Sequence, residues 1–92
     1  MSSLPEPLRV TLRNFCHVEW VEVPELRDLI KEGRMNVDVV LLEDQMNQML
    51  DSGELPVEEI NKLTSNEFES IEEAAEWLTK IRSVVFRDEP WS

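Results

Sequence analysis

Several residue types are scarce in this chain, and each scarcity removes a class of function. There is no tyrosine, and the only cysteine and histidine are Cys16 and His17. Neighbouring side chains on a helix point about 100° apart, so Cys16 and His17 would not converge as a nucleophile and its base. A single cysteine cannot form an internal disulfide. One cysteine and one histidine are also too few ligands for a structural zinc site. We therefore expect no enzymatic activity, no metal and no cofactor.

Long apolar runs are also missing. No stretch approaches the ~20 residues needed to span a bilayer. The N-terminal sequence MSSLPEPLR lacks the basic start and apolar segment of a secretory signal. With the single cysteine, these features predict a cytoplasmic protein that makes no membrane contact.

Basic residues are outnumbered. Twenty acidic residues against nine basic ones give a net charge of −11 at pH 7. Such a chain repels nucleic acid and anionic membranes, and it attracts a basic protein partner. The alternative is that the charge only keeps a small protein soluble.

The residues that are present indicate one small helical domain. A chain of 92 residues buries enough surface for one core and too little for a deep enclosed site. Five segments carry helical spacing or capping signals, which predicts an all-α bundle of four to five short helices. We expect one domain over residues 1–92, with frayed tails at 1–3 and 88–92. The oligomeric state is left open, and a monomer is the simplest expectation.

The longest apolar-rich run, Asn36 to Asp51, predicts the central helix of this bundle. Asn36 can cap its start, and Gly53 can take the left-handed conformation that closes it. One face carries Val39, Leu42, Met46, Met49 and Leu50. A second flank carries Val37, Val40 and Leu41. Apolar residues on two flanks predict neighbours on two sides.

Two expected elements precede this run. A first helix starts at Ser3 and Pro5, and its apolar face is Leu8, Leu12, Phe15 and Cys16. The alternation of Leu8, Val10 and Leu12 would also suit a strand. Residues 18–23 form an extended connection to Pro24, which opens a second helix. Gly33 ends that helix.

Two expected helices follow the run. Pro56 opens the first, whose apolar face is Val57, Ile60 and Leu63. The second begins with a capping box, Ser70 with Glu73, and ends by Pro90. Its stripe consists of Ile71, Ala74, Ala75, Leu78, Ile81 and Val85. The predicted core centre is Leu42, Met46, Leu50, Trp20, Leu78 and Ile81.

One short motif, Phe15 to Trp20 with the sequence FCHVEW, resembles the start of the CdiI-type immunity proteins of bacterial contact-dependent growth inhibition. That family pattern has two aromatic residues, then His-x-Asp-Trp. Phe15, His17 and Trp20 match it. Cys16 replaces an aromatic residue and Glu19 replaces the aspartate.

The resemblance extends over roughly residues 8–85. Glu43 to Leu50 is similar to the family's central helix, with Met49–Leu50 at a Leu-Leu position. Val57 to Leu63 is similar to its short helix, and Glu76–Trp77–Leu78 to its closing helix. This implies an all-helical protein that binds and blocks the toxic C-terminal domain of a sibling-delivered toxin, often a nuclease. It implies no catalytic role for the histidine or tryptophan.

A structural role is the simpler explanation for these two residues. Trp20 would fill space in the core, while His17 would form a hydrogen bond with the backbone or with the Glu19 carboxylate. Cys16 would be a small buried apolar residue.

The acidic segment Glu54 to Glu76 is the candidate contact with such a toxin. Its only base is Lys62, and its acids are Glu54, Glu58, Glu59, Glu67, Glu69, Glu72, Glu73 and Glu76. A nuclease has a basic substrate groove, which a dense acidic face can occupy or be steered towards. The alternative is local, because acids at a helix N-terminus are favoured by the helix dipole. That effect accounts for roughly half of the cluster.

Two other functions compete with immunity. A DNA-mimicking or phage-encoded acidic inhibitor of a DNA-binding protein would carry carboxylates at phosphate-like spacing over much of its surface. A generic adaptor would offer an apolar groove, with Trp91 near the C-terminus taking part. The sequence does not identify the toxin.

Overall fold

The computed structural model describes residues 4–17, 20–35 and 37–90, without the side chains of Trp20 and Val21. Within these ranges the chain forms five helices and two two-residue strands. Their order is α1 (Leu8–Phe15), β1 (Cys16–His17), β2 (Trp20–Val21), α2 (Val23–Lys31), α3 (Val39–Ser52), α4 (Val57–Thr64) and α5 (Ile71–Arg87). The predicted all-α bundle is confirmed.

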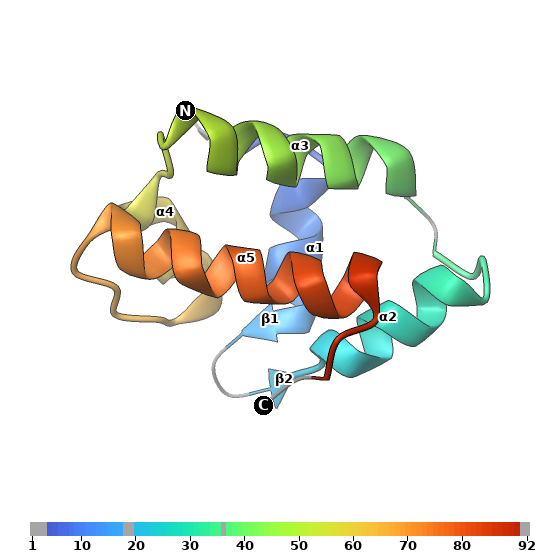
Figure 1. Cartoon of the computed structure of the whole chain (residues 1–92). Coiled ribbons are helices and arrows are strands. Elements are labelled where there is room, and N and C mark those ends of the chain that lie inside the picture. Colours follow the sequence, from blue (N-terminus) through green and yellow to red (C-terminus); the bar gives the residue numbers. More distant parts are fainter. Residues whose placement is uncertain (1–3, 18–19, 36, 91–92) are drawn as a thin grey trace.

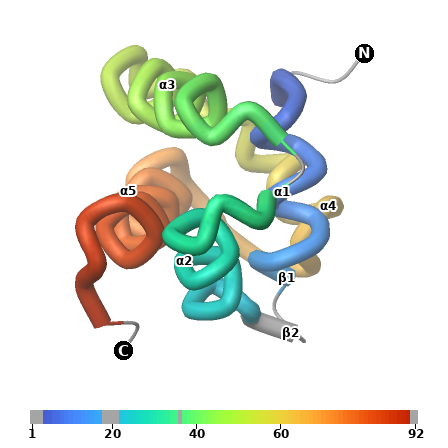
Figure 2. Tube along the Cα trace, turned by 90° about the vertical axis from the view of Figure 1, so that its right-hand side faces the viewer, coloured from blue at the N-terminus to red at the C-terminus, as the bar shows by residue number. Residues whose placement is uncertain are grey.

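The longest of these helices, α5, lies between α3 and α2 in the view of Figure 1. It packs against α2 on one side and against α3 on the other. Helices α3 and α5 lie side by side and run in opposite directions. Helix α1 crosses behind them and contacts α2, α3 and α4, as the turned view in Figure 2 shows.

The prediction that the Asn36–Asp51 run forms the central helix is wrong. Helix α3 forms an outer layer, and two residues of its expected second flank, Val40 and Leu41, face solvent. Val40 is 78 % exposed and Leu41 is 41 % exposed, whereas Leu42 and Met46 are fully buried. The stripe of α3 that contains Leu42 and Met46 covers α5 and α1. Val40 and Leu41, on the other side of α3, therefore have no helix to pack against.

The core lies where the five helices meet. Its buried apolar residues are Leu4, Leu8, Leu12, Cys16, Val23, Leu26, Leu42, Met46, Leu55, Ile60, Ala74, Leu78, Ile81, Val84 and Val85. Four of the predicted central residues, Leu42, Met46, Leu78 and Ile81, are among them. Leu50 is only partly buried, and the Trp20 side chain lies outside the described atoms.

Two helix starts differ from expectation. Helix α1 begins at Leu8, after a turn, rather than at Ser3 and Pro5, and Ser3 lies outside the described residues. Helix α3 begins at Val39, because the Asp38 carboxylate accepts a hydrogen bond from the Leu41 amide at 3.1 Å. Asp38 therefore caps the helix that Asn36 was expected to cap, and Asn36 is also outside the described residues.

Helix α2 begins at Val23, one residue before the expected Pro24, whereas the two closing glycines and the capping box agree with the structure. Gly53 adopts φ +70° and closes α3, and Gly33 adopts φ +67° after α2. The Gly33 amide donates to the Ile30 carbonyl at 3.1 Å, and the Arg34 amide to the Leu29 carbonyl at 2.9 Å. This pair of bonds is the Schellman arrangement, which satisfies the last carbonyls of a helix. At the start of α5, the Ser70 hydroxyl accepts from the Glu73 amide at 3.3 Å, as the capping box predicts.

A minimal antiparallel hairpin joins α1 to α2. Cys16 pairs with Val21 and His17 with Trp20, where a single extended connection was expected. The Glu22 amide also donates to the Phe15 carbonyl at 2.8 Å. Cys16 therefore ends α1 and enters the hairpin, although it was expected on the helical face. Its side chain is nevertheless buried, as predicted.

Gln45 ties the start of α1 to α3. Its Oε1 accepts from the Leu8 amide at 3.1 Å, and its Nε2 donates to the Glu6 carbonyl at 2.7 Å. Leu8 opens α1, so its amide has no partner within the helix. The buried glutamine supplies one across 37 residues of sequence.

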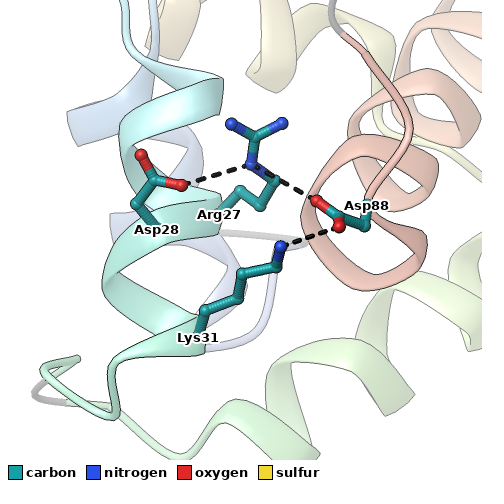
Figure 3. A network of polar contacts seen from close by, with 4 residues as sticks. All are labelled: Arg27, Asp28, Lys31 and Asp88. Atoms are coloured by element: carbon teal, nitrogen blue, oxygen red, sulfur yellow. Dashed lines mark hydrogen bonds and ion pairs between the residues drawn. The ribbon is translucent and has the colours of Figure 1, made fainter.

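A charged network fastens the end of α5 to α2 (Figure 3). Asp88 caps α5 with φ +58°, and its Oδ2 lies 2.7 Å from Lys31 Nζ. Its Oδ1 lies 3.8 Å from Arg27 Nε, which is also 3.3 Å from Asp28 Oδ1. Lys31 holds the pKa of the Asp88 carboxyl below its usual range, with a smaller contribution from Arg27. Residues 91–92, the far end of the expected tail, lie outside the described residues.

Candidate protein-binding surface

Helix α4 carries the first part of the acidic segment. Pro56 precedes its first turn, Ile60 is fully buried against the core, and Val57 and Leu63 are partly buried. Ser65 ends the helix in the left-handed conformation, with φ +58°. With this apolar side turned inward, Glu58 and Lys62 point to solvent.

The eight predicted contact acids do not have the same surroundings. Seven are exposed, namely Glu54, Glu58, Glu67, Glu69, Glu72, Glu73 and Glu76. The eighth, Glu59, is partly buried and bonded within the fold. Its Oε1 accepts from the Leu4 amide at 3.0 Å, and its Oε2 lies 3.6 Å from Arg9 Nε. Glu59 therefore holds the N-terminal segment and α1 against α4.

Five acids that follow α4 are exposed, and we call them together the acidic rim: Glu67, Glu69, Glu72, Glu73 and Glu76. Glu72 and Glu76 are one turn apart on α5, so their side chains are neighbours. Glu73 Oε2 accepts from the Glu69 amide at 3.4 Å. Within the part of the chain that the structure describes, no rim carboxylate forms an ion pair with a base. The rim therefore presents unneutralised charge to solvent.

The connection that carries Glu67 and Glu69 is held to α4 by Asn61. The Asn61 Nδ2 donates to the Phe68 carbonyl at 3.0 Å, and the Phe68 amide donates to Asn61 Oδ1 at 3.1 Å. The Phe68 ring packs on Trp77 of α5, with ring centroids 5.3 Å apart and a tilt of 52°. These contacts give the acidic rim a defined backbone.

A surface hollow lies between α1 and α4, and we call it the α1/α4 groove. Its volume is about 950 Å³. Its charged lining consists of Arg9, Arg13, Glu58, Glu59 and Lys62. Its apolar lining consists of Leu55, Pro56, Val57, Leu63 and Ile71. Ile71, expected in the core stripe of α5, is 44 % exposed.

A smaller hollow of about 690 Å³ lies between the end of α3 and the start of α4. It shares Leu55, Pro56 and Ile71 with the α1/α4 groove. Its other lining residues include Met49 and Glu54. Ile71, the first residue of α5, therefore lines both hollows and directly precedes Glu72 of the acidic rim.

Sequence reasoning missed Arg9 and Arg13. They lie far upstream of the acidic segment, so a count along the chain left Lys62 as its only base. Folding places both arginines beside α4. Their spacing of four residues, next to the buried Leu8 and Leu12, is the local signal that they share one side of α1. The surface is therefore mixed in charge at α4 and acidic at the start of α5.

The described part of the Phe15–Trp20 motif lies partly inside the fold. His17 is buried, and its Nε2 is 2.9 Å from the Ser65 hydroxyl at the end of α4. Burial raises the pKa of the Cys16 thiol to about 12. Glu19 and the Trp20 side chain lie outside the described atoms, so their expected roles stay predictions. Among the described residues, no group of three or more His, Cys, Asp and Glu is placed to hold a metal ion.

Comparison with family models, with characterised proteins and with solved structures finds no match to this chain. Among the helices that the structure describes, none is both long enough and apolar enough to cross a membrane. The family resemblance therefore rests on the sequence motifs alone.

Proposed function

We propose that this chain is an immunity protein of a contact-dependent growth inhibition system. It would bind the toxic C-terminal domain of its cognate toxin in the cytoplasm and neutralise it. The toxin domain would be basic, as expected of a nuclease. The chain would act by binding alone, as a monomer, without catalysis, metal, cofactor, nucleic acid or membrane.

The observation that carries the proposal is the acidic rim. Its five carboxylates are exposed and form no ion pair with any described base, so their field reaches into solvent. A nuclease domain has a cationic substrate groove, and complementary charge accelerates its encounter with the rim. The FCHVEW motif and the helix patterns that resemble CdiI-type proteins support the same function.

The test uses the C-terminal domain of a large exported protein encoded immediately upstream of this chain. One triple variant combines Glu67→Lys, Glu72→Lys and Glu76→Lys. Its control combines Glu25→Lys, Asp51→Lys and Glu89→Lys, which are exposed acids outside the rim. The two triples change the net charge equally. Association rates are measured by stopped flow, and protection by growth on co-expression.

We expect the rim variant to associate more slowly than the control and to protect less. The difference should shrink with salt, because the Debye length falls from ~10 Å at 0.1 M to ~3 Å at 1 M. Equal slowing by both triples would show that charge acts only globally. Failure of the natural chain to bind the domain would overturn the proposal. Displacement of DNA from a DNA-binding enzyme would then favour the DNA-mimic alternative.

A further inference from the structure

We infer that the α1/α4 groove is a second contact site, which takes an apolar side chain of the protein partner flanked by a carboxylate. The inference depends on the proposed function only for the identity of that partner. Ile71 lines the groove and directly precedes Glu72 of the acidic rim, so one partner surface can reach both. The partner would then place basic groups on the rim and an acidic, apolar group in the groove.

The charge of the groove is the first argument. Three of the nine bases in the chain, Arg9, Arg13 and Lys62, line it, although the net charge of the whole chain is −11. Glu59 is held by Arg9 and by the Leu4 amide. Two cations, Arg13 and Lys62, therefore face one remaining carboxylate, that of Glu58.

Arg13 and Lys62 are also available to a partner. Both are exposed, and neither forms a hydrogen bond or ion pair with another described residue. In 0.1 M salt, charges beyond about 10 Å are largely screened. A carboxylate in the groove therefore experiences these two cations more strongly than the distant acids of the chain.

The apolar lining is the second argument. Leu55 is buried, Val57 and Leu63 are partly buried, and Ile71 is 44 % exposed. Ile71 is one of three large apolar residues that the described surface leaves exposed. An inserted apolar side chain would remove Ile71 and its neighbours from water, which is favourable in proportion to the area covered.

These two properties select the occupant. A nucleic acid or an anionic membrane carries many negative charges, and the net charge of the chain repels it. A protein segment with one carboxylate beside an apolar side chain matches both the cations and the apolar lining. Opposite charges on the rim and in the groove also favour one orientation of the partner over the reverse.

The test uses charge reversals that are expected to speed association through net charge but to weaken the contact made in the groove. Arg13→Glu with Lys62→Glu makes the chain more acidic, and Arg34→Glu with Arg87→Glu does so equally at exposed bases outside the groove. Steering by net charge alone predicts that both double variants associate faster with the basic toxin domain. If the groove is a contact site, only Arg13→Glu with Lys62→Glu should raise the dissociation rate, by roughly tenfold or more. Equal dissociation rates for the two variants would overturn the inference.

A second measurement is independent of the toxin. The fluorescent probe 8-anilinonaphthalene-1-sulfonate is an apolar anion, so we expect the folded chain to bind it in the groove. Binding should be lost in Arg13→Glu with Lys62→Glu and in Ile71→Asp, and retained in Arg34→Glu with Arg87→Glu. Thermal unfolding checks that each variant is folded. Absent binding, or equal binding by all variants, would overturn the inference.

The two proposals fail separately. Probe binding in the groove without binding of the toxin domain would leave the groove in place and overturn the immunity function. Toxin binding that depends on the rim, with an unchanged dissociation rate in the groove variant, would overturn the groove and leave the immunity function in place.

Discussion

The side-chain amide of Asn61 pairs with both backbone polar groups of Phe68, at 3.0 and 3.1 Å. In the α4–α5 connection, the Asn61 amide thus satisfies one backbone donor and one backbone acceptor, as a neighbouring strand would do in a sheet. Phe68 lies between Glu67 and Glu69, so the same two bonds orient the backbone of the acidic rim. Packing of the Phe68 ring on Trp77 fixes this connection to α5 as well.

Replacing Asn61 should loosen this connection. In Asn61→Ala the Phe68 amide and carbonyl both lose their partner, which costs about 1–3 kcal/mol when such groups stay shielded from water. Urea unfolding should show the loss, and hydrogen exchange should accelerate at the Phe68 amide. Asn14→Ala, at an exposed position of α1, is the control and should change stability by less than about 0.5 kcal/mol. Unchanged exchange at Phe68 would contradict the role given to Asn61.

Two adjacent leucines of α3 test which face of that helix is buried. Leu42 is fully buried and Leu41 is 41 % exposed. Leu42→Ala should lower the free energy of unfolding by about 2–5 kcal/mol, because it removes buried methyl groups and leaves a cavity. Leu41→Ala should have a much smaller effect. Chemical unfolding of both variants decides this, and equal losses would mean that the outer face of α3 is covered.

The thiol of Cys16 should be unreactive in the folded protein. Its pKa is raised to about 12 by burial, and only 2 % of the residue is exposed. At pH 8 the thiolate is therefore scarce and shielded, and a disulfide reagent such as 5,5′-dithiobis(2-nitrobenzoate) should react only as the chain opens. Leu42→Ala should raise the reaction rate because it makes opening more frequent. Rapid labelling of the unaltered protein at pH 8 would contradict the burial.

The Asp88 network should stabilise the fold only where its carboxylate is ionised. The Lys31 ammonium, with Arg27, lowers the folded pKa of Asp88 from its usual value of 3.8. Its contribution is therefore complete above pH 3.8 and is lost as pH falls through the lower, folded value. Asp88→Asn should be less stable than the natural chain at pH 7, and the two should converge in acid. Asn still tolerates the left-handed conformation of this cap.

Urea unfolding at pH 7 and in acid measures this convergence. Glu89→Gln is the matched control, because Glu89 is adjacent and forms no ion pair with a described residue. A stability difference between Asp88→Asn and the natural chain that persisted unchanged in acid would show that the ion pair does not cause it.

Local signals in the sequence were sufficient to predict the helices and most of their ends. The capping box at Ser70, the opening proline at Pro56 and the closing glycines Gly33 and Gly53 act within a few residues. A helical apolar period also depends only on neighbours along the chain. These features therefore indicated the helix class and most helix ends. The start of α3 was misplaced because two nearby polar residues, Asn36 and Asp38, could serve as its cap. The start of α1 was misplaced because that helix begins after Pro7 without a side-chain cap.

The neighbours of each helix were decided only by the tertiary structure. Periodicity identifies an apolar face, but it does not say which other face will cover it. That choice depends on how all five described helices pack at once, so α3 became an outer layer and Val40 stayed in solvent. The same packing brought Arg9 and Arg13 beside α4. The net charge and the order of the acids were determined by the sequence, whereas the pairing of those acids with distant bases depended on the fold.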